Sequence, residues 1–234
     1  MERLDKIIAS QGKYSRKEVK KLVQAKKVEI DGIVAKNSDM KIDEKSAIIK
    51  IDGKELEIKK YIYLILNKPQ GYVSATEDKN DKTVLELVPE EYQNRGLFPA
   101  GRLDKDTTGL MILTNDGKFA HNILAPKKHV KKCYEVEIDI PVTEEMVEKF
   151  ANGIKLNDGE CKTSKLIITG ENTAIVELTE GRYHQIKRMF GCCKAKVIKL
   201  NRISMGNLKL PEDLKQGKCR ELTEEELKKT FEIA

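Results

Sequence analysis

Apolar positions at the start of the 234-residue chain recur first with the period of helices and then with that of strands. Two short helices are predicted, one ending at Gly12 and one starting at a capping box of Ser15 and Glu18. Their apolar faces are formed by Leu4, Ile7 and Ile8 and by Val19, Leu22 and Val23. Residues 28–36 then alternate around an Asp-Gly pair, which predicts a hairpin.

From residue 61 onward the pattern predicts mainly strands, with single helices between them. Apolar runs or strict alternation indicate strands over residues 61–68, 97–103, 110–114, 132–140, 165–169 and 173–178. Helical periodicity indicates helices over residues 143–153, 182–193 and 222–231. The lysine-rich residues 53–60 are interpreted as a linker. Because a regular strand-helix alternation is missing, the pattern predicts an α+β fold on a mixed, largely antiparallel sheet.

Composition narrows the class of protein. Hydrophobic residues make up 39% of the chain and charged residues 35%, which is typical of a folded globular protein and not of a disordered one. The longest apolar run, YIYLIL, is far too short to span a bilayer, and the N-terminus lacks the apolar core of a signal peptide. The five cysteines show no C-x-x-C spacing and are interpreted as reduced thiols. These features predict a cytoplasmic protein.

The excess of positive charge lies at one end of the chain. Residues 1–27 hold nine Lys/Arg against three Asp/Glu. The remaining residues hold equal numbers of both signs, so the net charge of +6 of the whole chain comes from residues 1–27. Such a concentration of charge suits a polyanion, and composition alone leaves a merely solubilising surface as an equal alternative. The candidate RNA contacts are the basic residues of the second predicted helix and its end, Arg16, Lys17, Lys20, Lys21, Lys26 and Lys27.

The segment AGRLDKDTTGL, residues 100–110, places charges between apolar runs. Asp104 follows Leu103 at the predicted end of a strand, where a fixed carboxylate can act as nucleophile or general base. The short polar side chains after it can bond the loop's own backbone and make it rigid. Two other interpretations stay open from these residues alone. One is an Asx-type turn without chemistry, and the other is the D-x-D-x-T motif of magnesium-dependent phosphatases, which requires a preceding parallel strand.

The order of the motifs resembles two known families. Two short helices, the second basic, followed by an Asp-Gly hairpin resemble the S4 RNA-binding domain. LNKPQGYVSATED, AGRLDKDTTGLMILTNDG, KKCYEVEI and EGRYHQIKRMF then follow, and the whole set is similar to the pseudouridine synthases of the RsuA type, which act on small-subunit ribosomal RNA. The resemblance implies an S4-like RNA-binding domain over residues 1–58 and a pseudouridine synthase catalytic domain over residues 61–234.

The resemblance also implies a reaction. The enzyme would be a monomeric isomerase without cofactor or metal, acting on 16S ribosomal RNA or a small-subunit assembly intermediate. Asp104 matches the aspartate that acts at the ribose, Tyr134 the tyrosine that packs on a flipped uracil, and Lys187 the basic partner that keeps the aspartate ionised. Supporting residues would be Arg102, Thr107 and Leu200. Further RNA contacts are expected from Lys68, His184, Gln185 and Arg188.

Two alternatives come from other functional classes. A non-catalytic RNA-binding protein would keep the S4-like domain beside a decayed enzyme domain, yet Asp104, Tyr134 and Lys187 are all retained. A magnesium-dependent phosphatase would need a downstream acidic pair to bind the metal, and the sequence shows none suited to that role. Chelator sensitivity separates the phosphatase from the synthase. Salt dependence does not separate the two RNA hypotheses, because phosphate contacts release counterions in both.

Overall fold

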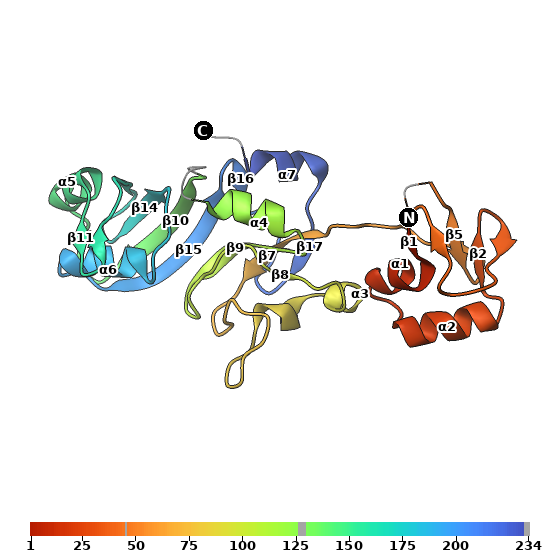
Figure 1. Ribbon diagram of the computed structural model, residues 1–234. Helices are drawn as coiled ribbons and strands as arrows, with labels where there is room; N and C mark the ends of the chain where they lie inside the picture. The colour runs from red at the N-terminus through yellow and green to blue at the C-terminus, as the bar shows by residue number, and fades with distance from the viewer. Residues whose placement is uncertain (45, 126–129, 232–234) are drawn as a thin grey trace. The chain divides into compact units, whose positions relative to one another are not determined.

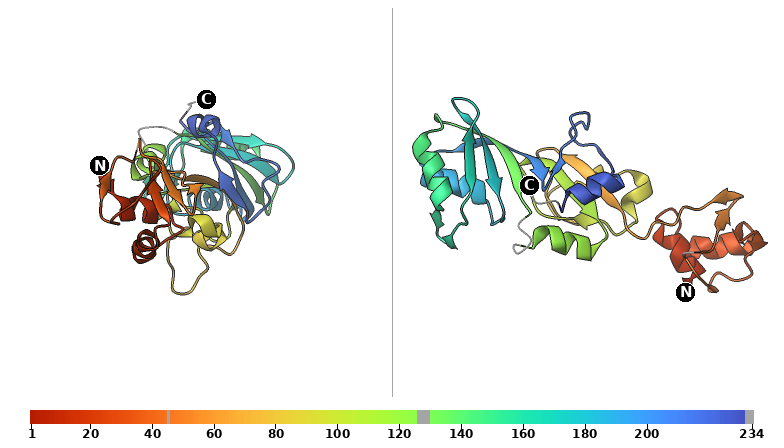
Figure 2. Two further views of the ribbon diagram at one scale, coloured as in Figure 1. Left: turned by 90° about the vertical axis from the view of Figure 1, so that its right-hand side faces the viewer. Right: turned by 90° about the horizontal axis from the view of Figure 1, so that it is seen from above.

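The computed structural model describes residues 1–44, 46–125 and 130–231, and the chain divides into two compact units (Figures 1 and 2). Each unit joins two stretches of chain: residues 1–62 with 88–97, and residues 63–87 with 98–234. A separate hydrophobic core lies inside each unit. None of the described helices has the length and apolar character needed to cross a membrane.

In the first unit helices accompany small antiparallel sheets. The helices are α1 (Leu4–Ser10), α2 (Arg16–Gln24) and the short α3 (Glu90–Gln93). The strands are β1 (Glu2–Arg3), β2 (Val28–Ile30), β3 (Ile33–Val34), β4 (Lys41–Ile42), β5 (Ile49–Ile51) and β6 (Lys54–Glu55). The predicted capping box of Ser15 and Glu18 is present at the start of α2. The predicted hairpin is confirmed as well, because Asp31 and Gly32 have φ values of 51° and 79°, as its tight turn requires.

The segment interpreted as a linker belongs largely to this first unit. Its residues Lys54–Glu55 form β6 and pair with β5. Leu56 and Ile58 are partly buried and pack against the first core. The linker interpretation is therefore wrong for these residues, because two apolar side chains among the lysines are held on the core by the surface they bury.

Over the residues that the structure describes, a nine-stranded sheet forms the frame of the second unit. Its strands are β7 (Tyr63–Lys68), β8 (Phe98–Pro99), β9 (Thr108–Thr114), β10 (Lys132–Ile138), β13 (Lys165–Ile168), β14 (Thr173–Leu178), β15 (Val197–Met205), β16 (Leu208–Lys209) and β17 (Cys219–Glu221). The main order is β13-β14-β10-β15-β9-β7-β17. The β15–β9 pair is parallel and the other pairs are antiparallel, which confirms the predicted α+β fold on a mixed, largely antiparallel sheet.

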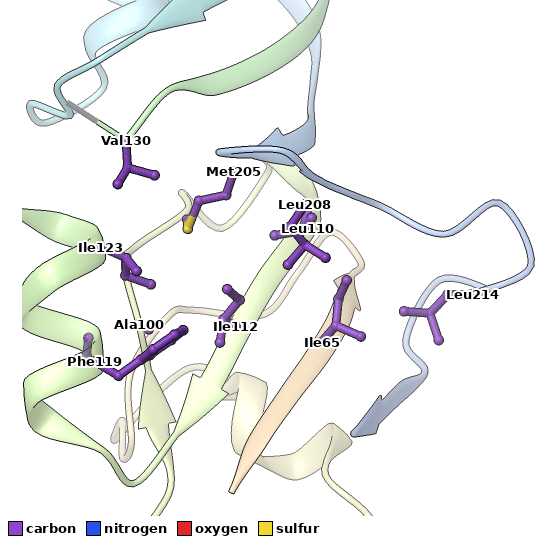
Figure 3. Close-up of a cluster of buried hydrophobic side chains, with 11 residues drawn as sticks. Ile65, Ala100, Leu110, Ile112, Phe119, Ile123, Val130, Met205, Leu208 and Leu214 are labelled. Carbon is purple, nitrogen blue, oxygen red and sulfur yellow. The ribbon is translucent and has the colours of Figure 1, made fainter. Parts of the chain in front are cut away.

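Helices and short elements complete the second unit. They are η1 (Val84–Leu87), α4 (Gly117–Leu124), α5 (Glu144–Asn152), the hairpin of β11 (Lys155–Leu156) and β12 (Gly159–Glu160), α6 (Gln185–Cys192) and α7 (Glu224–Lys229). Three of these helices, α5, α6 and α7, lie where helices are predicted, whereas α4 is not predicted. The Asp116 carboxylate accepts from the backbone N–H groups of Lys118 and Phe119 at 3.0 and 3.1 Å and thereby starts α4. Figure 3 shows Phe119 and Ile123 of this helix facing Ile112 of β9 in the buried core.

Residues 100–107 form a loop and not the end of a strand. β8 ends before this loop and β9 begins after it. Ser74 clamps the loop, because its Oγ donates to the Leu103 carbonyl at 2.6 Å and accepts from the Leu103 N–H at 2.9 Å. The prediction of a strand that ends at Asp104 is wrong, and the strand context that the phosphatase motif requires is absent here.

Candidate active site

A buried lysine at the end of β7 holds this loop in shape. The Lys68 ammonium donates to the backbone carbonyls of Pro69, Asp104, Lys105 and Thr107 at 3.1, 3.0, 3.3 and 2.8 Å. Burial lowers the pKa of Lys68 to about 8. Because its side chain is fully buried and its donors are used, Lys68 does not reach a phosphate, and the predicted RNA contact is wrong. Lys68 instead fixes the backbone around Asp104.

Two carboxylates of the loop share one cation from α6. The Lys187 Nζ lies 3.0 Å from Asp104 Oδ2 and 2.5 Å from Asp106 Oδ1. Burial alone would lower the pKa of Lys187, but the hydrogen bonds to the two aspartates outweigh burial and raise it above its usual value. For Asp106, burial would raise the pKa, and the bond to Lys187 brings it below its usual value. Lys187 and Asp106 are thus ionised at neutral pH, and Asp104 meets Lys187 through Oδ2.

An aromatic pair borders the second oxygen of Asp104. His184 Nε2 lies 3.5 Å from Asp104 Oδ1. The His184 ring stacks on Tyr183 with centroids 3.8 Å apart and an angle of 18° between the planes. His184 has φ 47°, a left-handed conformation that costs free energy for a residue with a side chain. Tyr183 is 72% exposed, so its outer face is free to stack on an unpaired base.

The loop, α6 and the β10–β15 pair enclose a cavity of about 590 Å³. Tyr134 on β10 and Leu200 on β15 give it a buried apolar wall. The strand register places Tyr134 directly opposite Arg202, which is also buried and also lines the cavity. A flat ring with polar edges is the kind of ligand that such a wall accepts. Within the residues that the structure describes, no three His, Cys, Asp or Glu side chains gather into a group that could hold a metal ion.

Residues that the sequence singles out for catalysis come together here although they are far apart along the chain. The cavity is lined by all the proposed catalytic and supporting residues, Asp104, Tyr134, Lys187, Arg102, Thr107 and Leu200. Their individual roles stay predictions. The proposed RNA-binding residues of the first unit, Arg16, Lys17, Lys20, Lys21, Lys26 and Lys27, are all exposed.

Two other residues with a predicted RNA contact have partners inside the protein. Gln185 is buried, accepts from the Arg182 N–H at 2.9 Å and donates to Glu180 at 2.7 Å. These bonds use its amide to shape the turn before α6, and because Gln185 also lines the cavity, its RNA contact stays a prediction. Arg188 forms two hydrogen bonds to the Asp158 carboxylate, so a phosphate would have to compete with that carboxylate.

Among the basic residues that line the cavity, sequence reasoning missed two that are buried, Lys132 and Arg202. Isolated charged residues in strand-like segments are usually exposed, so the sequence pattern predicts neither residue as part of a site. The available signal was the alternation in KCYEVEI, which places Lys132 on the same face as Tyr134.

Comparison with known proteins matches this arrangement to one family. Residues 62–191 match the model described as RNA pseudouridylate synthase, and residues 2–48 match the S4 domain. YtzG of Bacillus subtilis, named an uncharacterized RNA pseudouridine synthase, is 43% identical over 230 residues, which cover 96% of each chain. Ribosomal small subunit pseudouridine synthase A of Escherichia coli is 39% identical over 228 residues, or 96% of this chain and 98% of that relative.

A solved structure agrees with this assignment. The crystal structure of a pseudouridylate synthase has a TM-score of 0.70 and 36% sequence identity, and the match covers 98% of this chain and 100% of that one. The family model spans the loop, β10 and most of α6, and the relatives align over nearly the whole chain, which includes β15. The chain therefore belongs to the RNA pseudouridylate synthase family and is a pseudouridine synthase with an S4 domain at its N-terminal end.

Proposed function

We propose that this pseudouridine synthase modifies 16S ribosomal RNA, at uridine 516, the usual target in enzymes of the RsuA type. The observation that carries the proposal is the ion pair of Asp104 and Lys187 beside a cavity with an apolar wall. The choice of RNA rests on similarity, over nearly the whole chain, to an enzyme named for the ribosomal small subunit. The substrate is free 16S ribosomal RNA or an intermediate of small-subunit assembly.

The reaction acts on atoms that are hidden inside stacked RNA, so the uridine is flipped into the cavity. Asp104 acts at the ribose, either by attacking C1′ or by removing a neighbouring proton. Lys187 balances the charge of this carboxylate, and the bonds of Lys68 keep the loop from rearranging as the reaction proceeds. Tyr134 and Leu200 pack on the faces of the uracil.

The first unit supplies RNA affinity in this proposal. Its exposed basic residues on α2 suit phosphates as point charges. The RNA-binding domain would extend over residues 1–58 and the catalytic domain over residues 61–234, and the protein would act as a monomer. The free thiols of all five cysteines favour a reducing compartment, the cytoplasm.

The test is formation of pseudouridine on 16S ribosomal RNA by the unaltered protein and by Asp104→Asn, both in a metal chelator. The Asn side chain fits the same space but cannot act as base or nucleophile, so conversion should fall by at least about 1000-fold. Asp213→Asn, which changes an exposed carboxylate that does not line the cavity, serves as the control and should convert normally.

Each result separates the alternatives. The proposal is supported if the unaltered protein and the Asp213→Asn control convert the RNA and Asp104→Asn does not. The position of the pseudouridine then identifies the modified uridine. If neither protein converts free RNA or subunit particles, the non-catalytic RNA-binding alternative gains. Conversion that stops when chelator is added would contradict a metal-free reaction and would reopen the D-x-D-x-T interpretation.

A further inference from the structure

Two buried cations in the cavity wall have no part in the chemistry described so far. Lys132 is 7% exposed, and among the described residues its Nζ donates only to the Val130 carbonyl, at 3.2 Å. Arg202 is 1% exposed, and its Nε donates to the Leu110 carbonyl at 2.7 Å. Arg202 Nη2 is buried and has no hydrogen-bond partner in the part of the chain that the structure describes. Within residues 1–44, 46–125 and 130–231, neither cation forms an ion pair.

The strand register places both cations beside the apolar wall. Arg202 lies opposite Tyr134 in the β10–β15 pair. Lys132 precedes Tyr134 by two residues and shares its face of the sheet, as Leu200 does with Arg202. A flat ring packed between Tyr134 and Leu200 would therefore turn one edge towards positive charge.

An unpaired buried charge is costly, and fold stability explains only part of this arrangement. The bond from Arg202 to Leu110 fills the place where β9 and β15 stop pairing, which is a structural role for Nε. That role leaves the unpartnered Nη2 and the second cation unexplained. Burial, and then repulsion from Arg202, lowers the pKa of Lys132 to about 8. An anion in the cavity would give Arg202 Nη2 a hydrogen-bond acceptor and would balance the buried charge of Lys132.

The reaction under the proposed function creates such an anion. When the C1′–N1 bond breaks, its electron pair stays on N1 and spreads to the carbonyl oxygens O2 and O4 of the uracil, while C1′ bonds to the Asp104 carboxylate or forms a double bond to C2′, whose proton Asp104 takes. The detached ring then turns, and C5 bonds to C1′ as the Asp104–C1′ bond breaks or the C2′ proton returns. The C5 proton passes to water, and N1 takes a proton from water. Substrate and product are isomers, so no oxidant or further reactant is needed. The negative charge exists only while the ring is detached.

We propose that Arg202 and Lys132 bind the uracil carbonyl oxygens and stabilise the negative charge of the ring while it is detached from the ribose. This inference rests on the proposed function and assigns two residues that contact the reacting base. Fixed positive groups aimed at charge that develops during a reaction accelerate it more than they strengthen substrate binding. The two residues therefore contribute to the rate of the chemical step.

The test measures single-turnover conversion by Lys132→Met and Arg202→Met at saturating RNA. Lys131→Met is the control, because Lys131 is the adjacent lysine, pairs with Glu177 and does not line the cavity. We expect each cavity variant to be about 100-fold slower, and the control unchanged, while the Kd for RNA stays within about two-fold in all three. Arg202→Lys, which keeps the charge, should be slowed less than Arg202→Met and guards against loss of folding.

A better leaving group distinguishes charge stabilisation from simple misplacement of the base. Fluorine at C5 stabilises the uracil anion, so the cations should matter less on RNA that carries 5-fluorouridine at the target. On that RNA, Lys132→Met should consume the 5-fluorouridine at a rate much closer to that of the unaltered protein than it does on RNA with uridine. A deficit of the same size on both RNAs would overturn the inference, and so would an equal deficit in Lys131→Met. Failure of the unaltered protein to convert any uridine would instead refute the proposed function.

Discussion

Lys68 shows how much of the site depends on one side chain that never meets the substrate. Its ammonium satisfies four backbone carbonyls, three of them in the loop that carries Asp104. A buried acceptor that loses its donor costs about 1–3 kcal/mol. The loop is thus held by a charge that could be mistaken, from sequence alone, for a phosphate contact.

Replacing Lys68 tests this assignment. Lys68→Met keeps most of the side-chain volume but removes every donor, so the free energy of unfolding should fall by about 2–4 kcal/mol and conversion should fall with it. Urea unfolding measures the first effect, with Lys118→Met at an exposed position of α4 as the control. An unaltered unfolding midpoint for Lys68→Met would contradict the role given to its hydrogen bonds.

What could be predicted at the scale of residues depended on motifs. Asp104 and Lys187 were predictable because their chemistry is carried by contiguous segments that resemble a known family. Lys132 and Arg202 were not predictable, because the sequence does not distinguish a charged residue that faces inward from a strand from one that is exposed. Alternation places Lys132 on the face of Tyr134, but the pairing between distant strands is needed to show that Lys132 and Arg202 face one cavity.

At the scale of helices and strands, the predictions depended on the residues that mark where each element starts and ends. The capping boxes of α2 and α7 combine two reciprocal hydrogen bonds and could be identified from sequence. The Asn-Asp-Gly run after β9 was ambiguous, because the same residues end a strand and cap a helix. Residues 100–103 were mistaken for the end of a strand, since the shape of the loop over residues 100–107 is set by distant side chains, Ser74 and Lys68.

The cap of α7 gives a prediction with a defined pH window. Glu226 accepts from the Thr223 N–H at 2.9 Å and forms two 2.8 Å bonds with Arg220 of β17. The hydrogen bonds with Arg220, against the opposing effect of burial, lower the pKa of Glu226 from 4.5 to about 2. Glu226→Gln should therefore lower the free energy of unfolding by about 1–2 kcal/mol at pH 7.

The sign of the pH effect follows from linkage. A lowered pKa in the folded state stabilises it fully above pH 4.5, and this stabilisation is lost as the pH falls towards about 2. The difference between the unaltered protein and Glu226→Gln should shrink over that window in thermal unfolding. Glu225→Gln, exposed in the same turn, should show little difference at either pH. A constant deficit for Glu226→Gln down to pH 2 would contradict the assignment.

The sheet has one junction on which the cavity depends. Two largely antiparallel parts meet where β15 pairs in parallel with β9, through Asn201 with Thr108 and Arg202 with Gly109. Gly109 has φ 101°, and a Cβ there would overlap the Arg202 backbone oxygen. We expect Gly109→Ala to cost about 3 kcal/mol or more in urea unfolding.

A second glycine provides the control for this junction. Gly191 lies in α6, and a Cβ there would meet nothing within 4 Å. Gly191→Ala should be neutral or stabilising by about 0.5–1 kcal/mol, because alanine is the better helix former. Equal stability of Gly109→Ala and Gly191→Ala would contradict the prediction, because it would mean that β9 and β15 can move apart at residue 109 without a loss of stability.

For the whole molecule, the net charge and the proposed catalytic residues lie in different stretches of the chain. The net charge of +6 is carried by residues 1–27, whereas Asp104, Tyr134 and Lys187 come from three segments of the second unit. The charge asymmetry was visible in the sequence because it needs no fold. The meeting of the three segments was not visible, because it requires the order of strands in the sheet.

This separation predicts that RNA affinity and chemistry can be altered independently. Replacing Lys17, Lys20 and Lys21 of α2 by Gln removes three exposed charges and none of the residues that line the cavity. Each lost phosphate contact should reduce the slope of log Kd against log salt by about 0.7, so the slope should fall by about 2 and binding should weaken by roughly 10-fold or more. At saturating RNA the rate of conversion should be unchanged.

The control removes the same amount of charge from the second unit. Lys155, Lys162 and Lys165 are exposed there, and the triple Gln variant should keep most of the affinity and the salt slope. Equal losses in the two triple variants would mean that net charge alone attracts the RNA. A fall in the saturated rate of the α2 variant would mean that the S4 domain also positions the target uridine, because a group that only adds uniform binding affects KM and leaves kcat unchanged.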